Sequence, residues 1–312
     1  MQGLIFKQFT INLLSLNNLP PKVAVFRYRP ACVLWVDGGD ASTFLQGQFS
    51  NDLGRLEPGG AAYGLWLDRR GRVIADSHVV RDATGGGFWV ASVTSPAVAV
   101  MKRLGDFIIA DDVALGDRTD GWCALALVGE GSGAWLRAQP RAGFLLKGRR
   151  AAAENWEWML PESERADADA AVGGARGLSE EELERMRIVA GLASVPRDIG
   201  PGDLPNEGGL ESEAISYSKG CYLGQEVMAR LRSRGSVRRA LVRVSGSGSP
   251  PPVPAPLWSG ERAAGELRSA VRGEAGRGFA GLALVQVSSA SSGTVLGLEK
   301  GGAPALEVAV VP

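Results

Sequence analysis

Short apolar runs with strand character dominate residues 55–130, and only one helical segment stands among them. Residues 61–82, AAYGLWLDRRGRVIADSHVVRD, predict a hairpin, because two apolar runs flank a turn at Asp68–Gly71. Ser95 followed by Pro96 suits the cap and first residue of the helix AVAVMKRLGDF. Further strands are predicted at GGGFWVASV, FIIADDVAL and WCALALVG. Because strands and helices do not alternate regularly here, the sequence predicts an α+β fold rather than βαβ winding.

Three further segments complete the expected organisation. ACVLWVDGGD predicts a strand ending in a Gly-Gly turn, after which the carboxylate of Asp40 is placed to cap the helix ASTFLQGQFSNDL. Ser179 and Glu182 form the pattern of a capping box for the helix EEELERMRIVAGL. After Arg239 the chain changes to short strands with Gly-, Ser- and Pro-rich turns, which predicts a small β-barrel or sandwich at the C-terminus.

The composition excludes several classes of protein. The 312 residues include 34 basic and 34 acidic side chains, so the chain has no overall charge with which to attract nucleic acid or a membrane. No apolar run is long enough to span a bilayer, and we expect no membrane association. The N-terminal segment MQGLIFKQFTINLLSLNNLPPK does not have the form of a signal peptide. No acidic residue precedes Asp37, however, which leaves a targeting extension open.

Cysteine and histidine are scarce. Cys32, Cys123 and Cys221 are widely separated, which predicts neither a disulfide framework nor a metal site and favours a reducing, cytoplasmic compartment. Cys32 and Cys123 lie in apolar strand patterns, so we expect both in the core. His78 is the only histidine, and its alternating strand favours a structural side chain over a catalyst.

A glycine-rich segment offers a weak nucleotide motif. In LVGEGSGAWL, Gly129, Gly131 and Ala134 match the pattern G-x-G-x-x-G/A of dinucleotide-binding proteins. That site also needs a βαβ unit and an acidic residue about 20 positions further on, for which Glu154 is only a loose match. A glycine-rich turn is therefore the favoured interpretation.

Cys221 stands among residues that differ from an ordinary core segment. A free cysteine is usually a buried small hydrophobe. Here Lys219 and the arginines downstream would favour a thiolate, and Gly220 and Gly224 would let the backbone approach a ligand closely. Both interpretations stay open from the residues alone.

The residues that follow Cys221 carry polar groups suited to anions and heterocycles. Gln225 and Glu226 could read the edge of a ring that bears nitrogens and an amino group, or could simply begin a helix. The arginines between 230 and 243 could bind phosphate or carboxylate groups, or form a solvated strand face. An RNA-binding module would rest on these arginines alone, and the balanced net charge weakens it.

The segment KGCYLGQE, residues 219–226, resembles the signature K-G-C-Y-x-G-Q-E of the YgfZ family. These are folate-binding proteins related to the T-protein of the glycine cleavage system, and they assist the assembly or maintenance of iron–sulfur clusters. Four other segments agree in order: DASTFLQGQFSNDL, RRGRVIAD, RIVAGLASVPRDIG and LPNEGGLE. The resemblance implies a T-protein-like α+β folate-binding body of two intertwined domains over residues 30–235. It also implies a C-terminal β-barrel over residues 236–312, with residues 1–29 as an N-terminal extension outside it.

The resemblance also implies roles for individual residues. Tetrahydrofolate would be the ligand, and Cys221 the essential thiol. Pro205-Asn206-Glu207 matches a Pro-x-Glu segment of the T-proteins, so Glu207 is the candidate to bind the pterin, whose buried N–H groups need an acceptor. The arginines Arg238 and Arg239 are candidates to meet the glutamate tail of folate. The remaining candidates for cofactor binding are Asn51, Lys219, Tyr222, Gln225, Glu226 and Arg230.

One departure separates this chain from the T-proteins. Those enzymes place adjacent acids after a glycine-containing turn, whereas this chain has Ala75-Asp76 at the corresponding place. We therefore expect a tetrahydrofolate-binding accessory factor that assembles or repairs iron–sulfur client proteins, including enzymes that modify tRNA. The alternative is a folate-dependent aminomethyltransferase. Direct binding to nucleic acid is not expected.

Overall fold

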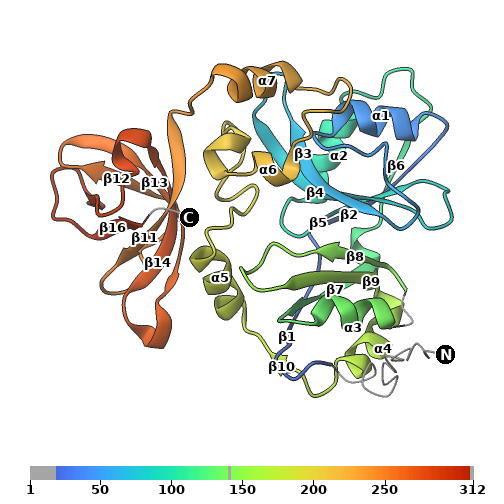
Figure 1. Ribbon diagram of the computed structural model, residues 1–312, viewed down its shortest axis with the longest axis horizontal. Helices are drawn as coiled ribbons and strands as arrows, with labels where there is room; N and C mark the ends of the chain where they lie inside the picture. Colours follow the sequence, from blue (N-terminus) through green and yellow to red (C-terminus); the bar gives the residue numbers. More distant parts are fainter. Residues whose placement is uncertain (1–18, 140–141, 310–312) are drawn as a thin grey trace, which may run out of the picture.

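The computed structural model describes residues 19–139 and 142–309 and contains three β-sheets (Figure 1). The first sheet has the order β3-β4-β5-β2-β6, and all its neighbouring strands are antiparallel. Helices α1 and α2 pack on it, and its core centres on Phe49 and Trp66, whose ring centroids are 4.7 Å apart. The bounds are β2 Cys32–Asp37, α1 Ala41–Gln48, β3 Ala61–Leu67, β4 Val73–Arg81, β5 Phe88–Ser92, α2 Ala97–Gly105 and β6 Ala114–Asp117.

The second sheet has the order β10-β1-β7-β9-β8, and only the pair β1–β10 is parallel. Strand β1 falls in the range that the sequence assigns to an N-terminal extension, and the predicted division of the chain into three regions stays a prediction. The bounds are β1 Ala24–Tyr28, β7 Trp122–Val128, α3 Ser132–Ala138, β8 Phe144–Lys147, β9 Asn155–Pro161, α4 Arg165–Ala171 and β10 Arg176–Gly177.

The third sheet forms a nearly closed C-terminal barrel. Its order is β12-β13-β14-β11-β16-β15, and a bridge between Trp258 and Gly297 brings its two edges together. Its side chains form a separate core around Leu257, Leu267 and Val285. The bounds are β11 Arg239–Gly246, β12 Ala255–Ser259, β13 Arg262–Arg272, β14 Phe279–Gln286, β15 Val295–Leu296 and β16 Leu306–Ala309.

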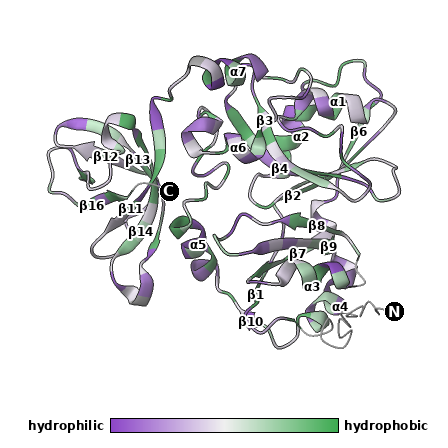
Figure 2. Cartoon of the chain, viewed as in Figure 1, coloured by the Kyte–Doolittle hydropathy of each residue, from purple (hydrophilic) through white to green (hydrophobic). Residues whose placement is uncertain are grey.

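The segment from residue 178 to 238 joins the two-sheet body to the barrel (Figure 1). It contains α5 (Glu180–Val189), α6 (Glu211–Ala214) and α7 (Gln225–Arg234), with a short 3-10 helix, η4, at Pro205–Gly208. Figure 2 shows hydrophilic residues gathered on α5 and α7. The expected capping box at α5 is present, because Ser179 and Glu182 each bond the other's backbone N–H. Together the three sheets confirm the α+β fold with a C-terminal barrel.

Three local expectations are wrong, and for the two expected helix caps a distant partner replaces the local one. The Asp40 carboxylate does not cap α1 but accepts from the backbone N–H of Asp112, 2.8 Å away. Ser95 does not cap α2, whose N-cap is Pro96, and its hydroxyl instead donates to Asp76. Most of the run FIIADDVAL is irregular, with a strand only from Ala114.

The glycine-rich segment before α3 is a turn and not a nucleotide site. Gly129 and Gly131 have positive φ angles of 142° and 84°, which a side chain would disfavour. The Glu154 carboxylate accepts from the backbone N–H groups of Gly131 and Gly133, at 2.8 and 3.1 Å. These are the donors that a phosphate would need, so the favoured interpretation as a turn is confirmed.

The predicted placement of Cys32 and Cys123 in the core is confirmed, since both are buried. Burial raises the pKa of each thiol. Among the described residues, no helix is long and apolar enough to cross a membrane. Over the same ranges, no group of three acidic, histidine or cysteine side chains gathers to hold a metal ion.

Candidate functional site

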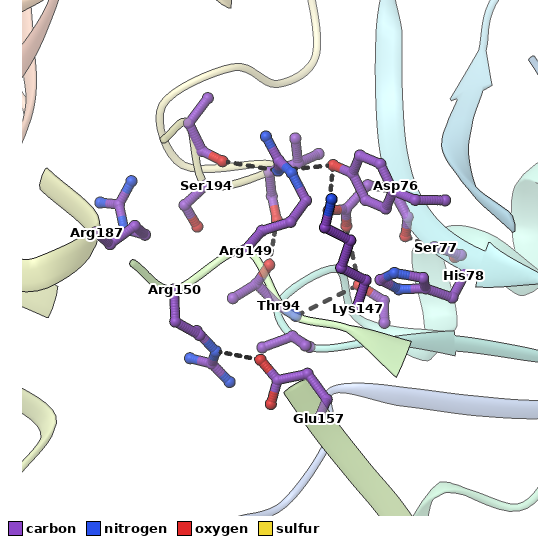
Figure 3. Close-up of a pocket in the computed structure, with 15 residues that line it drawn as sticks. Asp76, Ser77, His78, Thr94, Lys147, Arg149, Arg150, Glu157, Arg187 and Ser194 are labelled. Atoms are coloured by element: carbon purple, nitrogen blue, oxygen red, sulfur yellow. Dashed lines mark hydrogen bonds and ion pairs between the residues drawn. The ribbon is translucent and has the colours of Figure 1, made fainter. Parts of the chain in front are cut away.

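A polar pocket lies where the two body sheets meet the segment after α5 (Figure 3). Its inner cavity, with a volume of about 50 Å³, is lined by residues of β3, β4, β5, β8 and β9, and we call it the Asp76 pocket. A neighbouring cavity of about 360 Å³ shares four of its lining residues, so the two cavities adjoin each other. The combined volume lies in the range usual for small-molecule sites. The shared residues are Thr94, Arg150, Arg187 and Ser194.

The Asp76 carboxylate is held by three hydroxyl groups. Ser92 and Ser95 donate to Oδ1 at 2.9 and 2.6 Å, and Tyr63 donates to Oδ2 at 3.0 Å. Asp76 is buried in β4, while its partners come from β3, the end of β5 and the loop after it. Three donors to one carboxylate fix its orientation.

Arg149 extends this network across the pocket. Its Nη1 donates to the Tyr63 hydroxyl at 2.9 Å and to the Ala193 carbonyl at 3.2 Å, and its guanidinium lies 4.6 Å from the centroid of the Tyr63 ring. Its Nε pairs with Glu213 at 2.9 Å. The ring of His78 also packs against Tyr63, with the two ring centroids 5.1 Å apart. The pKa of His78 is lowered to about 3, mainly because the imidazole is buried and in addition because Arg149 is positively charged. The imidazole is therefore neutral.

A second buried pair forms the opposite wall. Arg150 Nε donates to Glu157 at 2.8 Å, and the Tyr28 hydroxyl donates to the other Glu157 oxygen at 2.8 Å. Burial and the charge of Glu157 raise the pKa of Tyr28. The Nη2 of Arg150 is buried and has no hydrogen-bond partner within the described part of the chain. Because an unpaired buried donor is costly, this N–H group marks a place where a ligand acceptor would be stabilised.

Cys221, the predicted essential thiol, is exposed on the segment that leads into α7. It lines neither the Asp76 pocket nor the cavity beside it. Its neighbour Lys219 is buried, and the Nζ donates to the carbonyls of Gln46, Phe49 and Asn51 at 2.6, 2.8 and 2.8 Å. Burial lowers the pKa of Lys219 to about 8, while the three carbonyls hold all three protons of the ammonium form. Lys219 therefore ties the signature segment to the end of α1.

The other candidates near the signature are partly bound to the protein itself. Tyr222 is buried, with its ring centroid 5.3 Å from the Lys219 ammonium. Gln225 accepts from the backbone N–H of Tyr222 at 3.3 Å, and Glu226 is exposed in the first turn of α7. Asn51 donates to the carbonyl of Tyr63 at 2.8 Å, so it alone of these residues bonds to the wall of the Asp76 pocket.

Glu207 and Arg230 lie together in a different cavity, of about 740 Å³, beside α7. The Glu207 carboxylate is buried and paired with Arg239, at 2.9 and 2.7 Å. One of its oxygens also accepts from the backbone N–H of Leu204, at 2.9 Å. A pterin at Glu207 would have to displace the guanidinium of Arg239, and the predicted folate contacts of these residues stay predictions.

The sequence does not point to Tyr63, Arg149, Arg150 or Glu157. The two arginines follow β8 in the segment KGRR, and a pair of basic residues after a buried strand is the only local signal. Glu157 carries a better signal, because it is an acidic residue inside the apolar strand NWEWMLP.

Comparisons with known proteins agree with this architecture. Residues 17–142 match the family described as the GCVT N-terminal domain. The crystal structure of the glycine cleavage system aminomethyltransferase T from Bartonella henselae superposes with a TM-score of 0.76 at 20% identity, covering 97% of this chain and 90% of that one. That similarity shows the fold.

Two further relatives are more similar in sequence to this chain than the aminomethyltransferase is. The human mitochondrial iron-sulfur cluster assembly factor IBA57 is 29% identical over 239 residues, which are 71% of this chain and 66% of that protein. The tRNA-modifying protein YgfZ of Escherichia coli O157:H7 is 27% identical over 238 residues, which are 69% of each chain. The signature KGCYLGQE, the three-sheet fold and these relatives all support the YgfZ family as the family of this chain.

Proposed function

We propose that this protein binds tetrahydrofolate in the Asp76 pocket and serves as an accessory factor for the assembly or repair of iron–sulfur proteins, including enzymes that modify tRNA. The names of its human and E. coli relatives, an iron-sulfur cluster assembly factor and a tRNA-modifying protein, support the second part. The observation that supports tetrahydrofolate binding in the Asp76 pocket is the unpaired Nη2 of Arg150.

The Asp76 pocket fits the chemistry of folate. A pterin presents N–H groups to acceptors and a carbonyl to donors, and folate also carries carboxylates. The pocket offers the carboxylates of Asp76 and Glu157 as acceptors and the free N–H of Arg150 as donor. The adjoining cavity adds the apolar side chains of Phe26, Leu183 and Pro196. When bound, tetrahydrofolate would supply a one-carbon carrier.

Cys221 has the exposure that a partner-facing thiol needs. A cluster usually takes four thiolates, and this chain offers one exposed cysteine, since Cys32 and Cys123 are buried. Any cluster held at Cys221 would therefore draw its other ligands from a client protein or a second subunit. All three cysteines are free, which agrees with a reducing compartment. We propose the cytoplasm, although the human relative is named as mitochondrial.

Aminomethyl transfer is the alternative function, and at the position where T-proteins have adjacent acids this chain has a single one, Asp76. Asp76 lines the pocket, whereas the neighbouring Ala75 packs in the core of the first sheet. Formation of methylene-tetrahydrofolate from an aminomethyl-lipoyl carrier, unchanged in Cys221→Ala, would favour the enzyme.

The folate site is tested by anaerobic calorimetric titration of tetrahydrofolate into the wild-type protein, Cys221→Ala and Arg150→Lys. The lysine keeps a positive charge opposite Glu157 but lacks the second arm of the guanidinium, which carries the unpaired Nη2. We expect equal affinity for the wild type and Cys221→Ala, and affinity lower by about tenfold or more for Arg150→Lys, since a hydrogen bond to a charged group contributes about 1.5–3 kcal/mol. Arg262→Lys, at an exposed position of β13, is the matched control. Undiminished binding to Arg150→Lys would remove the Asp76 pocket as the site.

The role of the thiol is tested separately, in cells that lack the native gene. The wild type should restore the activity of iron–sulfur enzymes, and Cys221→Ser should not, although it still binds folate. Full restoration by Cys221→Ser would contradict a function for this thiol.

A further inference from the structure

The cavity beside α7 gathers six arginines from three segments of the chain, and we call it the arginine groove. The turn between β3 and β4 contributes three of them, α7 contributes one, and the start of β11 with the residue before it contributes two (Figure 1). The groove has a volume of about 740 Å³. These residues are Arg69, Arg70, Arg72, Arg230, Arg238 and Arg239.

Close packing of the β3–β4 turn on α7 creates this arrangement. Gly71 sits in the turn with a φ of +70°, and a Cβ there would come within 2.8 Å of Met228 and 2.9 Å of Val227. Gly224, at the start of α7, is equally close to the turn, since its Cβ would lie 3.0 Å from the Asp68 carbonyl oxygen. Two glycines thus let the turn and the helix approach until their arginines face one cavity.

Only one of the six guanidinium groups is neutralised by the protein. Arg239 pairs with Glu207 and Asp203, at 2.7 and 2.9 Å. The other five are exposed and have no carboxylate within ion-pair distance among the described residues. The guanidinium of Arg69 lies over an aromatic ring, 5.8 Å from the centroid of Phe107. The chain as a whole is neutral, so this local excess of positive charge is a property of the groove.

We propose that the arginine groove binds a ligand that carries several phosphate groups, either the backbone of a single-stranded RNA or a free polyphosphate. Five unpaired guanidinium groups repel one another, and a dense anion removes that repulsion. Planar guanidinium groups bind phosphate oxygens in pairs, which suits consecutive phosphates better than a single carboxylate. No aromatic side chain lines the groove among the described residues, so recognition of the phosphates would be independent of base sequence.

The groove is separate from the proposed folate site. It shares no lining residue with the Asp76 pocket or with the cavity beside that pocket. Of the arginines for which the sequence left a solvated strand face open, Arg230 lies on helix α7 and not on a strand, and Arg230, Arg238 and Arg239 line the groove. The proposal goes beyond a role in folate binding, and its test contains no folate.

The test measures binding of a short fluorescein-labelled single-stranded RNA by fluorescence anisotropy over a series of potassium chloride concentrations. The full chain is compared with the double variant Arg70→Gln, Arg238→Gln and with the control Arg262→Gln. For five phosphate contacts, log K should fall against log salt with a slope of about −3.5. The double variant should bind the RNA at least about tenfold more weakly, and the magnitude of its salt slope should be smaller by about 1 to 1.5. The control should bind as the wild type does. Because both positions are exposed, thermal unfolding should show both variants folded.

Two competitors distinguish the sources of phosphate. Tripolyphosphate should displace the RNA from the wild type, which supports phosphate as the recognised group. Calorimetric binding of tripolyphosphate without any RNA binding would identify a free polyphosphate as the ligand. Hexaglutamate that competes as well as tripolyphosphate would overturn the proposal in favour of an acidic peptide. Equal binding of RNA and of tripolyphosphate by the wild type and the double variant would also overturn it.

Discussion

At the scale of single residues, His78 illustrates how burial fixes the state of a side chain that usually titrates near neutral pH. The imidazole is buried in β4, packs on Tyr63 and lies close enough to Arg149 to feel its charge. Both influences disfavour the imidazolium and lower the pKa to about 3 from an ordinary value of 6.5. His78 therefore serves as a neutral wall of the Asp76 pocket, which agrees with its predicted structural role.

The free energy of unfolding should rise with pH between about 3 and 6.5 through this one group. In that window the unfolded imidazole binds a proton that the buried one does not, so lower pH favours the unfolded state. The slope should approach about 1.4 kcal/mol per pH unit, and the contribution should be constant above pH 6.5. Urea unfolding of the wild type and of His78→Gln at several pH values measures it. If the free energy of unfolding varied with pH in the same way in both proteins, the prediction would be contradicted.

At the scale of elements, the signature KGCYLGQE contains two glycines with different structural demands. Gly224 is the N-cap of α7, with a φ of +89°, and packs against the β3–β4 turn. Gly220 has ordinary backbone geometry, and a Cβ there would meet nothing within 4 Å. Only Gly224 is required by the fold, because it needs both the left-handed conformation and the absence of a side chain.

Gly224→Ala should lower the free energy of unfolding by about 1–3 kcal/mol, since the alanine combines an unfavourable φ with a close contact. Gly220→Ala is the matched control in the same segment and should stay within about 0.5 kcal/mol of the wild type. Chemical denaturation monitored by circular dichroism compares the two. If Gly220→Ala were the more damaging of the pair, the packing of α7 on the turn would not explain the signature.

At the scale of the whole molecule, a buried ionic network joins the connecting segment, residues 178–238, to the barrel. Arg187 of α5 donates to Asp198 at 2.6 Å and to Ser269 of the barrel strand β13 at 3.0 Å. The Ser269 hydroxyl donates to the other Asp198 oxygen, and all three side chains are buried. Glu184 adds a second carboxylate to Arg187. The barrel is therefore positioned by paired charges as well as by apolar packing.

Asp198→Ala should destabilise the protein by about 3–5 kcal/mol, because it leaves the buried guanidinium of Arg187 with one of its two carboxylates. Asp167→Ala, at an exposed position of α4, is the control and should have little effect. Urea unfolding with tryptophan fluorescence measures both variants. A change below about 1 kcal/mol in Asp198→Ala would show that apolar contacts alone hold the barrel in place.

The sequence by itself determined the features that depend on neighbouring residues. The hairpin at residues 61–82, the capping box at Ser179 and the α+β composition with its terminal barrel follow from apolar periodicity and turn chemistry, which are local. The segment KGCYLGQE indicated the YgfZ family, because eight consecutive residues carry a specific pattern.

Only the tertiary structure decided which side chains meet. Ser95 and Asp40 have the residue types of helix caps, yet each bonds a group more than fifteen positions away. Asp76 gathers its donors from three segments, and the turn at Asp68–Gly71 meets α7 across more than 150 positions. A hydrogen-bond partner or a shared cavity depends on how distant segments pack, and residue spacing along the chain does not encode that packing.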